Sequence, residues 1–344
     1  MEFLADLGLF FGKALIVVLA ISLVIAAIAR AGRGGRAPRG APRIVARRLN
    51  EQYRRMARAV EGAFLTPRAL RAIRKEDKAR RKAERKAVAD ATSARPRVFV
   101  LEFDGNLRAT AVDALADEVT AVLAVAKPGD EVVVKLTSPG GIVPGYGLGA
   151  AQLERVRAAG VRLTVVVDKV AASGGYMMAA VADHVVAAPF AVIGSIGVVA
   201  GIPNLHRFLK KRDVDYELLT AGEYKRTLTV LGENTKAGRE KMQSDLEEIH
   251  TLFKDHVKRH RPSVDLEKVA TGEHWYGTQA LDLGLVDALG TSDDYLVQKV
   301  RMADVVGVKR EGRRGLAERL GRAAASIVDT TADRVAERLR GDLI

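Results

Sequence analysis

Short apolar segments alternate with longer amphipathic segments from residue 98 to residue 188. The short segments have the length and β-branched content of buried strands, and the longer ones have the spacing of amphipathic helices. Strands that alternate with helices form βαβ units, whose strands run parallel. The sequence therefore predicts an α/β fold with a mostly parallel sheet. We expect strands at 98–103, 131–136, 161–168, 184–188 and 216–219, and helices at 109–126, 146–159 and 236–259.

Two glycine-rich turns follow strands of this predicted sheet. Residues 138–141 read SPGG after the second strand, and residues 173–175 read SGG shortly after the third. Ligands bind to parallel sheets beyond the carboxyl ends of the strands. We therefore expect both turns to border one site.

Ser173 stands where an apolar strand pattern turns into a helix, within the sequence VAASGGYMMA. Such a turn can push a hydroxyl into a cleft and point backbone N–H groups at the atom that the hydroxyl attacks. The glycines fit this interpretation because tight turns and close backbone approach need residues without Cβ. A serine here can equally be the N-cap of a buried helix. From this stretch alone both interpretations stay open.

A serine nucleophile needs a general base, and no histidine stands in a suitable motif. There are no cysteines, which excludes disulfides, a thiol nucleophile and Cys-ligated metals. His256 and His260 are four residues apart in the basic stretch KDHVKRHR, which favours a solvated helix face over a metal site. Burial can lower the pKa of a lysine enough for it to act as a base. The candidates are Lys169, just before the serine turn, and Lys225, within AGEYKRTLT, and composition does not choose between them.

The N-terminal residues 3–29 are strongly apolar, and the stretch 7–29 contains one charged residue, Lys13. If Lys13 snorkels toward the headgroups, the segment has the roughly 20 residues that a bilayer crossing needs. Its positive charges follow the apolar run instead of preceding it, which favours a retained anchor over a cleaved signal peptide. The positive-inside rule then places the following residues on the cytoplasmic side.

A basic block follows this predicted anchor. Residues 30–97 contain 22 Lys and Arg against 6 Asp and Glu, whereas the whole chain has a net charge of +13. The block begins as a linker rich in Gly, Pro and Arg and continues as a helical pattern of mixed charges that suits an exposed stalk. Its arginines could bind anionic lipid headgroups. It has few aromatic residues, so we expect no specific binding of nucleic acid.

Four motifs in this order resemble peptidase family S49, the signal peptide peptidase A group, and most closely its single-unit SohB-type members. The motifs are TSPGG at 137–141, VAASGGYMMA at 170–179, PFAVIGSIGVV at 189–199 and AGEYKRTLT at 221–229. The resemblance implies a ClpP/crotonase-like fold and a Ser/Lys dyad, with Ser173 as nucleophile and Lys225 as general base. It further implies that Ser195 orients the lysine. The oxyanion hole would be formed by the amides of Gly174 and of Gly140 or Gly141.

The resemblance also implies the function. We expect a serine endopeptidase, anchored to the cell (inner) membrane by a single span, that hydrolyses hydrophobic peptides such as remnant signal peptides or membrane-protein fragments. It would need no metal or other cofactor. Members of the family assemble homo-oligomeric rings, in which the serine and lysine of one site can come from neighbouring subunits. Many relatives act on the outer side of the membrane, whereas the arginine distribution here favours the cytoplasmic side.

Two other functions remain open at this stage. One is a crotonase-like acyl-CoA lyase or hydrolase, which would use the same two amides with a carboxylate as acid or base. The other is a non-catalytic membrane scaffold on the same fold. Under each of these functions the sequence predicts the same four parts. They are an anchor at 1–29, a basic linker and helical stalk at 30–96, the S49-like domain at 97–300 and an amphipathic helical tail at 301–344. The apolar stripe of the tail, at 314–340, suits packing or self-association.

Overall fold

The computed structural model describes residues 43–66 and 95–311, together with 68–69, 71–73, 75–76 and 79 between them. The chain divides into two units, Met1–Arg43 with Glu311–Ile344, and Ile44–Arg310. The second unit holds nearly all the described residues. The predicted anchor at 1–29 and the predicted helix at 314–340 lie outside the described residues.

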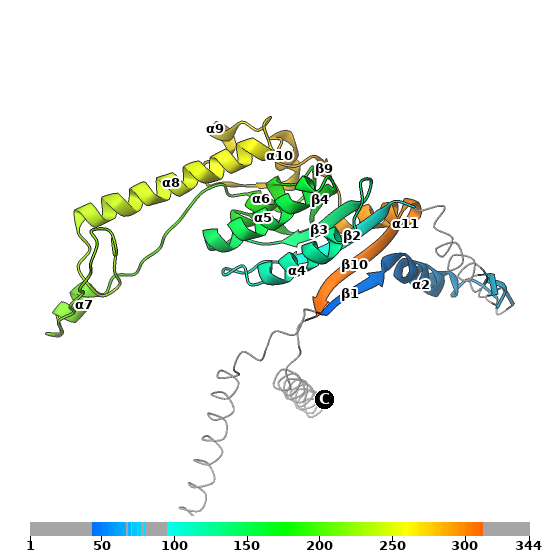
Figure 1. Cartoon of the computed structure of the whole chain (residues 1–344), viewed down its shortest axis with the longest axis horizontal. Helices are drawn as coiled ribbons and strands as arrows, with labels where there is room; N and C mark the ends of the chain where they lie inside the picture. Colours follow the sequence, from blue (N-terminus) through cyan, green and yellow to red (C-terminus); the bar gives the residue numbers. More distant parts are fainter. Residues whose placement is uncertain are drawn as a thin grey trace, which may run out of the picture. The chain divides into compact units, whose positions relative to one another are not determined.

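The main sheet has seven strands in the order β1-β10-β2-β3-β4-β6-β9 (Figure 1). Every neighbouring pair from β10 to β9 is parallel, which confirms the predicted mostly parallel α/β sheet. The carboxyl ends of these strands therefore meet at one edge. The strands are β1 (Arg43–Arg48), β2 (Arg97–Asp104), β3 (Glu131–Thr137), β4 (Arg162–Val167), β6 (His184–Ala187), β9 (Ala288–Leu289) and β10 (Asp304–Glu311).

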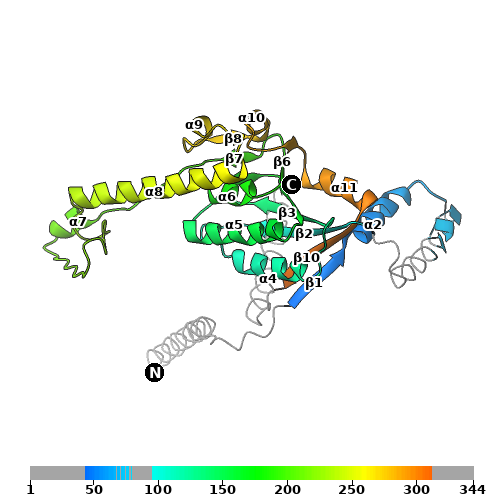
Figure 2. The same cartoon turned by 45° about the horizontal axis from the view of Figure 1, so that its top comes forward.

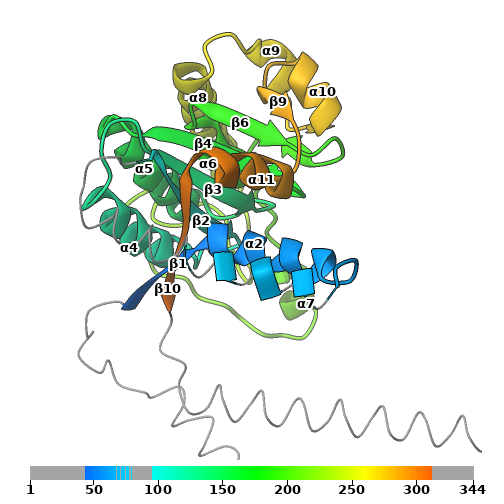
Figure 3. The same cartoon turned by 90° about the vertical axis from the view of Figure 1, so that its right-hand side faces the viewer.

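Helices cover both faces of this sheet (Figure 3). The helices α4 (Val112–Leu123), α5 (Val143–Ala158) and α6 (Gly174–Ala180) lie on one face. The helices α2 (Leu49–Glu61) and α11 (Ser292–Met302) lie on the other. Successive strand residues point to opposite faces, so Val132 and Val134 pack with the first group and Val133 packs with the second. All three are fully buried, and this explains why the strands read as continuous apolar runs.

A second, three-stranded sheet lies next to the first and has the order β5-β7-β8. Its strands are β5 (Val170–Ala172), β7 (Val192–Gly194) and β8 (His274–Tyr276), followed by the short helix α10 (Gly277–Asp282). An isolated bridge between Ser138 and Ala171 connects β5 to the end of β3. This bridge fixes the two glycine turns relative to each other.

The helix α8 (Lys236–His260) is only partly packed on the body of the unit. Its buried residues, Phe253 and Val257, lie in its C-terminal half. Its N-terminal half extends away from the sheet together with α7 (His206–Lys210), as Figures 1 and 2 show. We call residues 200–242 the arm. The arm exposes many large apolar side chains, namely Ile202, Leu205, Phe208, Val214, Tyr216, Leu218, Leu219, Tyr224 and Val230.

The structure differs from the sequence-based expectations in several places. Residues 216–219 form no strand and lie exposed in the arm, because no neighbouring strand pairs with them. The segment expected to be a helical stalk begins with β1, and α2 packs against the sheet. Strand β10 extends the sheet beyond residue 300. Within the described part of the chain, no helix has both the length and the apolar character for a bilayer crossing.

Asn50 on α2 explains why this part of the predicted stalk is held on the sheet. Its side-chain amide donates to the carbonyls of Val300 and Ala303 at 3.0 and 2.8 Å, and its oxygen accepts from the amide of Val305 at 2.7 Å. Asn50 is buried, so removing its side chain would leave these backbone groups without partners.

We expect Asn50→Ala to destabilise the protein by about 3 kcal/mol, because it leaves several buried polar groups unsatisfied. The measurement is thermal unfolding of the full-length protein in detergent, followed by circular dichroism. The matched control is Gln52→Ala on the exposed face of the same helix. An equal effect of the two substitutions would contradict the anchoring role of Asn50.

Candidate active site

Ser173 occupies a strained turn between β5 and α6. Its backbone has φ 51° and ψ −121°, a conformation that residues other than glycine rarely adopt. The turn is held because the amide of Ser173 donates to the carbonyl of Gly194 at 2.7 Å. Ser173 stands at the N-cap position of α6, yet its side chain makes no capping hydrogen bond. The N-cap interpretation is therefore wrong. The strain fits a serine held for chemistry.

The second glycine turn packs directly against this serine. Gly140 has φ +91°, and a Cβ placed on it would lie 2.7 Å from Cβ of Ser173 and 2.9 Å from the amide nitrogen of Gly174. Only glycine therefore fits at this position. Ser138 hydrogen-bonds through its backbone to both ends of β5, which brings the turns together as the sequence predicted.

A chain of buried hydroxyl groups supports the turn at residues 138–141. The amide of Gly140 donates to Oγ of Ser138 at 3.1 Å, and this oxygen lies 2.6 Å from the hydroxyl of Tyr146. Tyr146 donates in turn to the carbonyl of Asn106 at 2.9 Å, so Ser138 is the donor to Tyr146. Burial raises the pKa of Tyr146, which keeps it a donor. Every polar atom of this chain has a partner.

Two backbone amides of these turns are available to bind a substrate oxygen. The amide of Gly174 is the first of α6 and has no carbonyl acceptor in its own helix. The amide of Gly141 donates to no carbonyl or side chain among the described residues. The amide of Gly140, by contrast, is already used by Ser138.

Ser195 lies on the third element of the site, immediately after β7. It also has a positive φ, 50°. Its amide donates to the carbonyl of Glu273 at 2.7 Å, and its hydroxyl donates to the carbonyl of Gly272 at 3.2 Å. Ser195 is half-buried and borders the same cleft as Ser173.

The cleft has a volume of about 850 Å³. Ser173, Ser195 and the three glycines of the predicted oxyanion hole all line it. The rest of its wall is mainly apolar and comes from the 138–141 turn, from the segment after Ser195 and from α8. These apolar residues include Ile142, Val143, Val198, Leu246, Ile249 and Phe253.

Lys225 is the predicted site residue that the structure does not bring to the cleft. It lies exposed in the arm, where its amide donates to the carbonyl of Gly222 at 3.2 Å, and it is not among the residues that line the cleft. Lys169, the alternative lysine, is also exposed. The single chain therefore places the nucleophile and its amide donors together without a lysine base.

His250 lines the cleft but was not predicted from the sequence. Its Nε2 lies 3.2 Å from the carbonyl of Ile196, next to Ser195. Because a carbonyl can only accept, Nε2 carries the proton. A signal was present, since His250 falls within the stripe formed by Leu246 and Phe253 on α8, which is the face that packs on the body.

The expectation that His256 and His260 form a solvated helix face was also wrong. Both are half-buried, because this end of α8 packs against α6 and His260 contacts Glu154 of α5. The stretch is basic in sequence, but Arg261 pairs with Asp287, and Lys258 donates to the backbone carbonyls of Pro262 and Val264.

Comparison with family models identifies the chain. The model described as "Peptidase family S49 N-terminal" matches residues 2–153, and the model described as "Peptidase family S49" matches residues 155–306. The chain belongs to peptidase family S49. The second match contains Ser173, Ser195 and the arm, and the first contains the 138–141 turn.

Relatives within the S49 family carry the name protease. The chain is 57% identical to "Probable protease SohB" of Haemophilus influenzae over 227 residues, which cover 66% of this chain and 64% of the relative. It is 55% identical to "Probable protease SohB" of Buchnera aphidicola subsp. Schlechtendalia chinensis over 59% of this chain and 67% of the relative. One similar solved structure is that of a lysine mutant of the 1510-N membrane-bound stomatin-specific protease in complex with a substrate peptide. Its TM-score is 0.45 and its sequence identity is 13%, and the match covers 66% of this chain and 99% of that chain.

Proposed function

We propose that this chain is a serine endopeptidase in which Ser173 attacks the peptide carbonyl. The observation that carries the proposal is the strained, uncapped serine of a chain that belongs to the S49 family, packed against a glycine turn in a cleft. We assign the oxyanion hole to the amides of Gly174 and Gly141. Gly140 is excluded from this role because its amide donates to Ser138. Each donor contributes about 3 kcal/mol in the transition state.

Lys225 is the general base in this proposal, and it acts in an assembled ring. A lysine accepts a proton only where its surroundings hold it neutral, which burial does. Lys225 is exposed on the arm of a single chain, and we propose that another subunit buries it in the active enzyme. The apolar side chains that the arm exposes support such an assembly. We infer that the arm of one subunit delivers Lys225 to the Ser173 of its neighbour, where Ser195 orients it.

The reaction then follows in two halves. Neutral Lys225 takes the proton of Ser173 as the serine Oγ bonds to the carbonyl carbon, and the resulting lysinium protonates the leaving amine. Lys225 next takes a proton from water, which attacks the acyl-enzyme, and the lysinium then returns that proton to Oγ of Ser173 as the acyl–oxygen bond breaks. No metal is required for these steps.

The substrates we propose are apolar peptides near a membrane. The wall of the cleft is mainly apolar, which suits small and apolar side chains. Residues 3–29 would anchor the chain to the inner membrane, and the basic block would contact anionic headgroups. Remnant signal peptides and fragments of membrane proteins have this chemistry.

Labelling with a serine-reactive fluorophosphonate is the experiment that tests this function. The intact protein is expected to be labelled at Ser173, located by peptide mapping, whereas Ser173→Ala is expected to remain unlabelled and Ser195→Ala to be labelled more slowly.

The crotonase-like alternative predicts the opposite result. Among the described residues that line the cleft, the carboxylate available to such an enzyme is Glu247. An enzyme that used Glu247 with the two amides would not be labelled. Failure of the assembled protein to react would therefore contradict the peptidase proposal.

A further inference from the structure

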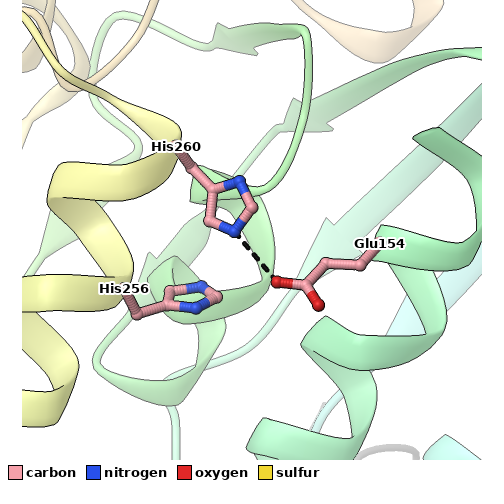
Figure 4. A group of neighbouring side chains, drawn as sticks. All are labelled: Glu154, His256 and His260. Atoms are coloured by element: carbon pink, nitrogen blue, oxygen red, sulfur yellow. Dashed lines mark hydrogen bonds and ion pairs between the residues drawn. The ribbon is translucent and has the colours of Figure 1, made fainter. Parts of the chain in front are cut away.

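Three side chains with metal-binding groups meet behind the cleft. Glu154 comes from α5, and His256 and His260 stand one turn apart on α8 (Figure 4). One potential ligand atom from each lies within 4.8 Å of the others, and all three residues are half-buried. The carboxylate and the imidazoles are separated by about 100 residues in sequence, so only the packing of α8 on α5 brings them together.

The hydrogen bonds of His256 leave one ring nitrogen for a ligand, whereas both ring nitrogens of His260 have partners. Nε2 of His256 lies 2.9 Å from the carbonyl of Met177, so it is the protonated nitrogen and Nδ1 has the free lone pair. A histidine that binds a metal commonly donates its other N–H to a backbone carbonyl in this way. Nε2 of His260 lies 2.9 Å from Oε1 of Glu154, which places both atoms on one side of the cluster.

We propose that Glu154, His256 and His260 bind a divalent late transition-metal ion, with Zn²⁺ as the ion of choice. Two imidazoles and one carboxylate form a donor set that suits Zn²⁺, whereas Mg²⁺ and Ca²⁺ prefer oxygen ligands alone. Bonds of about 2.1 Å from each ligand would draw the cluster together by small side-chain rotations. Water would complete the coordination.

Two arginines near these histidines have carboxylate partners. Arg157 pairs with Asp183 at 2.7 Å, and Arg261 pairs with Asp287 at 2.8 Å, which offsets part of their charge.

One contact competes with the metal and provides a sharp test. Arg157 approaches Nδ1 of His260 to 3.1 Å as a donor, which requires a lone pair on Nδ1 and a proton on Nε2. A metal on Nε2 reverses this arrangement, since Nδ1 then carries the proton. Arg157→Gln replaces the competing donor with an amide oxygen that can accept this proton. We therefore expect this substitution to tighten binding.

The main experiment titrates Zn²⁺ into full-length, tag-free, metal-stripped protein in detergent. Calorimetry is expected to give one site per chain, and elemental analysis after dialysis should find one zinc per chain. His260→Ala, His256→Ala and Glu154→Gln are each expected to weaken binding by at least ~10-fold. The matched control, His206→Ala on α7, also removes one histidine and is expected to bind as the intact protein does.

Thermal unfolding separates loss of the site from loss of the fold. Zinc is expected to raise the unfolding midpoint of the intact protein, because a ligand that binds the native state stabilises it. Glu154→Gln should unfold cooperatively and show no such increase.

Several results would overturn the proposal. They are the absence of a stoichiometric site in the intact protein, unchanged binding in the three ligand variants, an equal loss in His206→Ala, or unchanged or weaker binding in Arg157→Gln. None of these measurements depends on peptidase activity.

Discussion

Lys225→Ala is expected to lower kcat/KM for peptide hydrolysis by ~10⁴-fold or more, and Ser173→Ala is expected to do the same, because each removes one half of a unit that acts together. The measurement is cleavage of a quenched fluorescent apolar peptide by the full-length protein in detergent. Lys169→Ala is the matched control, since this lysine is exposed and precedes the serine turn. Its activity should be unchanged.

Mixing the two inactive variants tests whether the site is shared. If Ser173 and Lys225 come from neighbouring subunits, co-assembly of Ser173→Ala with Lys225→Ala in equal amounts regenerates about one quarter of the sites. If the arm folds over its own body, the mixture remains inactive. Full activity of Lys225→Ala alone would contradict its role as base, whatever the mixture does.

Gly140→Ala is the second substitution with a large expected effect. Its Cβ would enter the space of Ser173 and of the Gly174 amide, and φ +91° is unfavourable for alanine. The turn must move, and the oxyanion donors move with it. We expect kcat to fall ~10²- to 10³-fold, as when an oxyanion donor is lost.

Gly147→Ala is the matched control for this substitution. Gly147 lies on α5, and a Cβ there meets no atom within 4 Å. Alanine should stabilise this helix by up to ~1 kcal/mol and leave kcat unchanged. Comparable kcat values for Gly140→Ala and the intact protein would show that the 138–141 turn does not form the oxyanion hole.

The sheet and the glycine turns could be predicted because their signals are local. Apolar runs of strand length mark β2, β3, β4 and β6, and parallel connections bring their carboxyl ends to one edge. The same logic predicted that Ser173 and Gly140 would meet. The prediction of a strand at 216–219 was wrong. Apolar residues in an exposed arm have the same sequence pattern as apolar residues in a paired strand.

The remaining features depend on contacts between distant parts of the chain. His250 reaches the cleft, and His256 and His260 meet Glu154, only because α8 packs across α5 and α6. The spacing within KDHVKRHR could not predict the contact of His260 with Glu154, which lies 106 residues away in the sequence. The distance of Lys225 from the cleft likewise could not be predicted from its motif, because a motif gives residues and not their positions in the fold.

The helix α8 is attached to the body at one end, so a small tilt at that end moves its other end farther. His250, His256 and His260 hold its C-terminal half to the body, while its N-terminal end, which begins at Lys236, belongs to the arm. The free portion of about 14 residues is about 21 Å long, so a tilt of about 10° at the attached half moves its far end by about 4 Å. That displacement exceeds the length of a hydrogen bond. Under the proposed function, small changes in the contacts of these three imidazoles would therefore decide whether Lys225 reaches a serine.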